Sequence, residues 1–179
     1  LAEIWLAYTH FRMGMIDLVL TELDSIQNKK LNRQQLFLIN NLLAEISIEQ
    51  DSLENVYNYY ELAAKYASSN SKKTSIYGKL VKIAEKKNNK LRASDYLEEL
   101  VKVAPDKIRI DSKMQWLIYQ RELGQYDKII NEIGSLLGLS EFQAEYIKLE
   151  LELGKIYIDK EEFNIAKDIL LQLVEVYSK

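Results

Sequence analysis

The sequence repeats itself every 36 or 37 residues. Residues suited to a tight turn recur at five equivalent positions, Gly14, Asp51, Asn88, Gly124 and Glu161. Apolar residues follow each of them at offsets of five, nine and twelve, as Val19, Leu23 and Ile26 do in the first period. These offsets share one stripe of an α-helix. A period of this length is typical of repeat architectures, whose units bury their apolar faces by stacking on neighbours.

The segment before each turn is equally regular. Eight positions upstream stand large apolar residues, Leu6, Leu43, Leu80, Trp116 and Leu153. One position later come mostly smaller residues that allow close helix packing, Ala7, Ala44, Val81, Leu117 and Gly154. Each period therefore predicts a first helix, a tight turn and a second helix, together an αα-hairpin. We expect the middle repeats to bury their apolar stripe, including Leu97, Leu100, Trp116, Ile133 and Leu136.

The predicted fold class is all-α, a right-handed α-solenoid of five stacked helix-turn-helix repeats. A single repeat domain would cover residues 1–179, with repeats at about 1–31, 32–70, 71–105, 106–139 and 140–179. The low content of one proline and six glycines fits a chain that is helical almost throughout. The chain starts at Leu1, inside an amphipathic pattern and without an initiating Met, so we interpret it as an excerpt of a longer protein.

Local polar residues predict where helices begin. Four pairs have the spacing of a capping box, in which a side chain accepts from the third backbone N–H of the helix. These pairs are Asp51 with Glu54, Asp159 with Glu162, Asn32 with Gln35, and Ser140 with Gln143. The first two pairs would open second helices, and the last two would open first helices.

Together, these residues resemble the tetratricopeptide repeat (TPR) family. The clearest stretch is Leu153-Gly154-x-x-Tyr157, followed by Phe163, Ala166, Leu170 and Leu173. The pattern departs from the family in its period, which is two or three residues longer than the usual 34, and in its single inter-repeat proline, Pro105. The resemblance implies an interaction module whose first helices line a concave face that holds a peptide or protein segment.

Carried over position by position, the resemblance gives a candidate peptide-binding groove. Its lining residues are Tyr8, Arg12, Asn41, Glu45, Glu49, Lys79, Lys82, Lys86, Gln115, Ile118, Arg121 and Lys155. Members of the family that bind chaperone tails grip a terminal carboxylate with Lys and Asn on first helices. The matching positions hold Ile4 and Tyr8, then Asn41 and Glu45, then Gly78 and Lys82, so that clamp is missing.

The charges of this groove permit two interpretations. Glu45 and Glu49 would make the second repeat acidic, whereas Lys79, Lys82 and Lys86, then Arg121 and Lys155, would make the C-terminal half basic. In the first interpretation these charges pair across repeats, for example Glu45 with Lys82. In the second, the basic half attracts an acidic segment of a partner.

Composition argues against several other classes of function. The net charge of -3 disfavours nucleic acid as a partner, and the twelve tyrosines are better explained by helix packing. There are no cysteines, and His10 is the only histidine, which we expect to be packed between helices. No catalytic motif appears, so we expect no enzyme, no metal and no cofactor. No apolar run is long enough for membrane insertion.

The function that the sequence favours is a scaffold or adaptor that binds a peptide or protein of unknown identity, with the cytoplasm as the favoured compartment. One alternative is the peptide-sensing repeat domain of a bacterial regulator with an effector module outside this chain. Another is a self-assembly module that forms a homo-oligomer through uncapped end helices.

Overall fold

A computed structural model describes residues 1–177 of the chain. Within this range it contains ten α-helices, one 3-10 segment and no strand. The helices are α1 (Ala2–Arg12), α2 (Ile16–Gln27), α3 (Arg33–Glu49), α4 (Leu53–Tyr66), α5 (Asn70–Lys86), α6 (Lys90–Val103), α7 (Asp106–Glu122), α8 (Tyr126–Leu137), α9 (Tyr146–Asp159) and α10 (Phe163–Tyr177). The 3-10 segment η1 (Ser140–Glu145) precedes α9. Odd-numbered helices are the first helices of the hairpins, and even-numbered ones the second.

All five predicted turn residues adopt the left-handed backbone conformation. Their φ angles are 78° for Gly14, 50° for Asp51, 55° for Asn88, 73° for Gly124 and 62° for Glu161, and no other described residue has a positive φ. Four of these turns also share the six-to-one backbone bond of a Schellman motif. In the first turn, the N–H of Met15 donates to the carbonyl of His10 at 3.0 Å. The turn positions predicted from the sequence are confirmed.

Three of the four predicted capping boxes are wrong, two of them because of these turns. Asp51 lies in the left-handed turn after α3, and α4 begins after Ser52 without a side-chain cap. Asp159 is the last residue of α9, two positions before the turn residue Glu161. Ser140 lies in η1, for which no side-chain cap forms. Only Asn32 and Gln35 make the complete box, at 3.0 and 2.9 Å.

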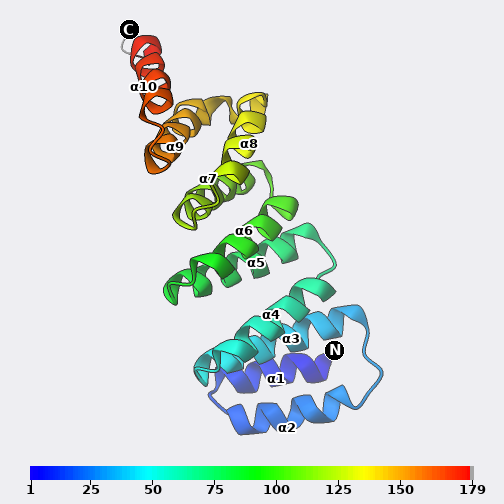
Figure 1. Ribbon diagram of the computed structural model, residues 1–179. Coiled ribbons are helices and arrows are strands. Elements are labelled where there is room, and N and C mark those ends of the chain that lie inside the picture. The colour runs from blue at the N-terminus through cyan, green and yellow to red at the C-terminus, as the bar shows by residue number, and fades with distance from the viewer. Residues whose placement is uncertain (178–179) are drawn as a thin grey trace. The chain divides into compact units, whose positions relative to one another are not determined.

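The chain divides into two compact units, Leu1–Lys86 and Lys87–Lys179. Unit 1 contains α1 to α5, in which α1 packs on α2 and α3, and α4 packs on α3 and α5 (Figure 1). Its core includes Ala7 of α1 and Val19 and Leu23 of α2 from the predicted pattern, together with Ile4 of α1 and Leu42 of α3, all fully or almost fully buried. Leu6, the first of the large apolar residues eight positions before the turns, is instead 50% exposed. The side chains left on the outer surface of α1, α3 and α5 are therefore held on a packed base.

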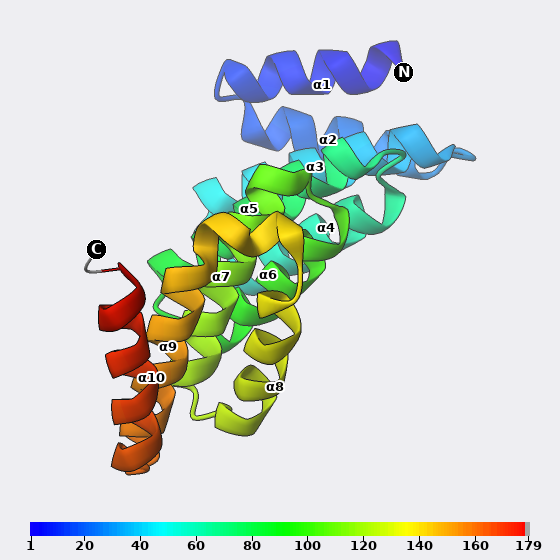
Figure 2. The ribbon, with the colours of Figure 1, turned by 90° about the horizontal axis from the view of Figure 1, so that it is seen from above.

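Unit 2 contains α6 to α10, in which each helix packs on the next along the chain, and α9 and α10 lie side by side (Figure 2). The residues expected to be buried are buried, namely Leu97, Leu100, Trp116, Ile133 and Leu136. Gly154 permits the close approach of α9 to α10, because a Cβ there would lie 2.9 Å from Cδ2 of Leu170. The prediction of an all-α fold of helix-turn-helix repeats is confirmed in both units.

No described helix combines the length and the apolar character that crossing a membrane requires.

Candidate peptide-binding surface

Three first helices of unit 1 bring four of the predicted groove residues into one hydrogen-bonded network. Asn41 of α3 donates through Nδ2 to Oη of Tyr8 on α1 at 3.0 Å and to Oε1 of Glu45 at 3.1 Å. Lys79 of α5 donates through Nζ to Oδ1 of Asn41 at 3.3 Å and to Oε1 of Glu45 at 3.1 Å. The Tyr8 hydroxyl in turn donates to the backbone carbonyl of Leu38 at 3.0 Å. Side chains from α1, α3 and α5 therefore form one connected polar surface.

The network is partly buried, and burial sets its electrostatics. Loss of solvent raises the pKa of Tyr8 to about 12. Burial also raises the pKa of Tyr60, on α4, with a further contribution from the Glu45 carboxylate. The Lys79 ammonium lies 5.0 Å from the centre of the Tyr60 ring, a cation–π contact that adds to its ion pair with Glu45. Both tyrosines therefore stay neutral at physiological pH.

Glu45 does pair across repeats, as the first interpretation expected, but its partner is Lys79 and not Lys82. Lys82 belongs to a set of four predicted residues that lie exposed one or two turns further along the same helices. The others are Arg12 on α1, Glu49 on α3 and Lys86 on α5. None of the four makes an ion pair within the described chain. Their charges are therefore free to meet a ligand.

Sequence reasoning missed the aromatic residue beside this network. Trp5 of α1 is 54% exposed, and its ring centre lies 5.4 Å from that of Tyr8 with the planes tilted by 38°. The signal was present, since Trp5 precedes Tyr8 by three residues and Arg12 by seven, which places all three on one face of α1. We call the surface made by Trp5, Tyr8, Asn41, Glu45 and Lys79, together with the four free charges, the first-helix face of unit 1.

The corresponding cations of unit 2 are neutralised by acidic residues of α9. Arg121 of α7 approaches Asp159 of α9 at 3.1 Å and Glu152 at 3.3 Å. Lys155 pairs with the same Glu152 at 2.5 Å. Glu152 has only 10% of its side chain exposed, and its Oε2 and the Arg121 Nε make no hydrogen bond within the described residues. The expectation of a basic surface at Arg121 and Lys155 is wrong, because the acidic residues of α9 balance it.

Two remaining groove candidates also have local roles in unit 2. Gln115 donates to the hydroxyl of Tyr119 on its own helix at 3.0 Å, and Ile118 is half-buried. One turn away, the buried Gln120 donates to Ser94 of α6 at 2.6 Å and fixes α7 on α6. Gln115 is thus bonded within its own helix, while Arg121 and Lys155 are joined through Glu152 of α9.

His10 is packed between the helices of the first hairpin, as expected. Its Nδ1 lies 2.9 Å from Oε1 of Glu22, so it joins α1 to α2. In the part of the chain that the structure describes, no group of three or more acidic or histidine side chains is placed to hold a metal ion.

The comparisons with known proteins concern the fold. None of the known sequence families matches the chain, and no curated protein matches it either. Among solved structures, the chain is similar to YrrB, described as a TPR protein with an unusual peptide-binding site. The match covers 99% of this chain and 86% of YrrB at 13% identity, with a TM-score of 0.52. The chain has a TPR-like fold. The resemblance drawn from Leu153, Gly154 and Tyr157 is confirmed at the level of the fold.

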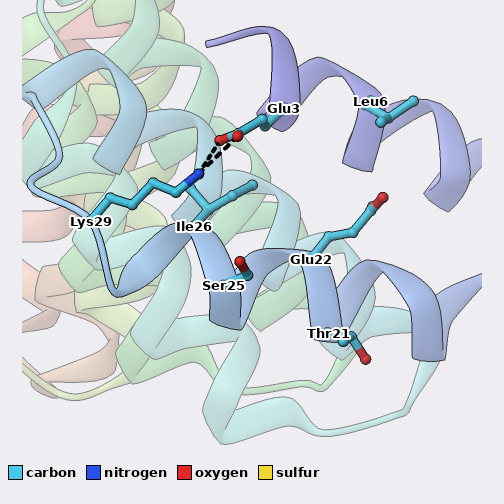
Figure 3. Close-up of a pocket in the computed structure, with 7 residues that line it drawn as sticks. All are labelled: Glu3, Leu6, Thr21, Glu22, Ser25, Ile26 and Lys29. Atoms are coloured by element: carbon cyan, nitrogen blue, oxygen red, sulfur yellow. Dashed lines mark hydrogen bonds and ion pairs between the residues drawn. The ribbon is translucent and has the colours of Figure 1, made fainter.

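The TPR-like equivalence of the hairpins also explains a hollow of about 280 Å³ between α1 and α2 (Figure 3). It is lined by Glu3, Leu6, Thr21, Glu22, Ser25, Ile26 and Lys29, none of which is a groove candidate. In the next hairpin the residues equivalent to Glu3 and Leu6 are Asn40 and Leu43, and both are buried. The hollow thus lies at a position that is buried in the second hairpin, and it is distinct from the first-helix face.

Proposed function

We propose that this chain is a non-catalytic interaction module that binds a peptide or protein segment on the first-helix face of unit 1. The observation that carries the proposal is the network joining Tyr8, Asn41, Glu45 and Lys79, because it fixes side chains from three helices in one surface. Binding sites need such preorganised side chains, since each side chain ordered on binding costs about 0.5–1.5 kcal/mol. The fold adds support, because YrrB, a protein of similar fold, is described as having a peptide-binding site.

The experiment has two steps. Peptides are first selected from a displayed random library against the whole chain, and each selected peptide is then footprinted by amide hydrogen exchange. We expect slower exchange in α1, α3 and α5 when peptide is bound, relative to α2 and α4. Slowing confined to the second helices, or to residues beyond 87, would contradict the proposal.

A matched pair of glycine variants tests the position of the ligand independently. Gly78 on α5 stands at the position that Asn41 occupies on α3, and a Cβ there meets no atom within 4 Å. Gly134 on α8 has equally open space. We expect Gly78→Tyr to block the selected peptides and Gly134→Tyr to leave their binding unchanged. Equal loss in both variants, or none in Gly78→Tyr, would count against this face.

A further inference from the structure

The hydrogen-bonding capacity of the network in unit 1 is largely used within the protein. The Asn41 amide donates to both Tyr8 and Glu45, and its oxygen accepts from Lys79. The Tyr8 hydroxyl both donates and accepts. A ligand that took these bonds would leave their former partners without one, at a cost of about 1–3 kcal/mol for each buried group. The network is therefore suited to holding neighbouring side chains in place, and ligand contacts fall to the groups around it.

The first such group is Trp5. Its ring is more than half exposed and lies against Tyr8, whose hydroxyl bonds hold that side chain on α3. An exposed Trp with a fixed neighbour offers a large apolar contact at little entropic cost. Tryptophan is also among the residues that dominate binding energy at protein interfaces. Trp5 is therefore suited to contact a bulky apolar side chain of the ligand.

The second group is the set of free charges. Arg12, Lys82 and Lys86 are cations and Glu49 is an anion, so these exposed residues together carry a charge of 3 − 1 = +2. The Glu45 carboxylate does not alter this balance, because Lys79 neutralises it at 3.1 Å. Charge complementarity speeds association and rejects ligands of the wrong sign. This sign is notable in a chain whose formal net charge is -3.

We infer that the first-helix face of unit 1 selects an acidic peptide segment that carries a bulky apolar residue. The acidic groups meet Lys82, Lys86 and Arg12, and the apolar residue packs on Trp5. This inference rests on the proposed function and adds the chemistry of the ligand. It differs from the sequence-based hypothesis, which also assigned the acidic segment to Arg121 and Lys155, because those two side chains have partners on α9.

The test uses three short labelled peptides of equal length with the whole chain. One is acidic with a central Phe-Leu pair, the second has Ser-Ser in place of that pair, and the third has Lys in place of every acid. Fluorescence polarisation should rank their affinities in the order given. The difference in affinity between the first and third peptides should become smaller as salt rises towards about 0.15 M, because salt screens the charges. Equal binding of the first and third peptides would overturn the inference.

Charge-reversed variants test the cations. We expect Lys82→Glu with Lys86→Glu to weaken the acidic Phe-Leu peptide by about tenfold or more. The control is Lys30→Glu with Lys65→Glu, which changes the net charge equally at exposed residues outside this face. Equal weakening by both double variants would show a general charge effect and contradict the inference.

Fluorescence of Trp5 tests the apolar contact directly. Trp5 and Trp116 are the two tryptophans of the chain, and Trp116 is only 2% exposed, so Trp116→Phe leaves Trp5 as the reporter. Saturating acidic Phe-Leu peptide should shift the Trp5 emission to shorter wavelength and protect it from iodide quenching. If Trp116→Phe fails to fold, the difference between the wild-type spectrum and that of Trp5→Phe gives the same information. Unchanged Trp5 emission at saturation would overturn the contact.

The failures of the two proposals can be distinguished. Library-selected peptides could bind and protect α1, α3 and α5 while none of the three designed peptides binds. In that case the inferred ligand chemistry is wrong, and the proposed binding face is supported. If no peptide protects these helices, both proposals are wrong.

Discussion

The two units use the same helix-turn-helix plan but treat the charges on their first helices differently. In unit 1, Lys79 is held by Asn41 and Glu45, while Arg12, Lys82 and Lys86 stay exposed and unpaired among the described residues. In unit 2, Arg121 and Lys155 are both paired with acidic residues of α9. A charged residue on a first helix is therefore not by itself a ligand contact. That depends on whether a counter-ion lies within reach, on the same first helix or on the adjacent one.

The largest effect should come from the cores, where the two units are alike. Leu42 of α3 and Leu100 of α6 are both buried, at 0% and 5% exposure. Replacing either by Ala removes apolar contacts and leaves a cavity, which should lower the free energy of unfolding by about 2–5 kcal/mol. Urea denaturation measures both variants. A loss below about 1 kcal/mol at one site would mean that this unit is less well packed than the other.

Removing a paired cation should cost more than removing a free one. Arg121→Met leaves the buried Glu152 with Lys155 as its remaining cation, and leaves Asp159 without its bond to Arg121. We expect the free energy of unfolding to fall by about 1–3 kcal/mol. This range is below that for a fully buried pair because the Arg121 side chain is partly exposed. Lys82→Met should change stability by less than about 0.5 kcal/mol. Similar losses of stability in the two variants would contradict the contrast between a paired Arg121 in unit 2 and a free Lys82 in unit 1.

Alkaline pH should reveal the network in unit 1. Folding raises the pKa of Tyr8 from 10.0 to about 12, so the unfolded chain releases this proton first as the pH rises. The contribution of the protonated Tyr8 hydroxyl to stability is therefore fully present below pH 10 and is lost between pH 10 and about 12. In Tyr8→Phe, stability should fall less steeply across this window. Denaturation at several pH values measures the slopes, and identical slopes would contradict the burial of the Tyr8 hydroxyl.

The smallest effects concern three helical glycines. A Cβ at Gly78 in unit 1, or at Gly134 in unit 2, meets no atom within 4 Å, so Ala should raise stability by about 0.5–1 kcal/mol through helix propensity. At Gly154 the added Cβ would lie 2.9 Å from Leu170, which must move. We expect Gly154→Ala to be less stable than the other two variants in thermal melts. A gain at Gly154 equal to that at Gly134 would show that α9 and α10 are not closely packed.

The sequence predicted the hairpins and turns because these depend on local rules. The left-handed turn conformation favours Gly and Asn, and the apolar stripe follows the helical period. The capping boxes failed at Asp51 and Asp159 because the Schellman turn determines where the first helix ends and the second begins. Spacing alone could not tell whether Asp51 would cap the second helix or adopt the left-handed turn conformation.

The site could be predicted only in part. The family resemblance included Tyr8, Asn41 and Glu45 among the groove candidates, and the structure joins their side chains by hydrogen bonds. The choice of Lys79 over Lys82 as the partner of Glu45 depends on how α5 is rotated against α3. One signal was available and overlooked. Glu152 and Asp159 are seven residues apart, on one face of α9, which is the spacing needed to balance Arg121 and Lys155.

The most direct measurement compares charge reversal in the two units against one ligand, the acidic peptide with a central Phe-Leu pair. One chain carries Lys82→Glu and Lys86→Glu, and the other carries Arg121→Glu and Lys155→Glu, so both change the net charge by the same amount. Circular dichroism first establishes that both are folded. We predict that the unit 1 variant binds about tenfold more weakly than the wild type, while the unit 2 variant keeps its affinity within about threefold. A greater loss in the unit 2 variant would contradict the assignment of the binding face to unit 1.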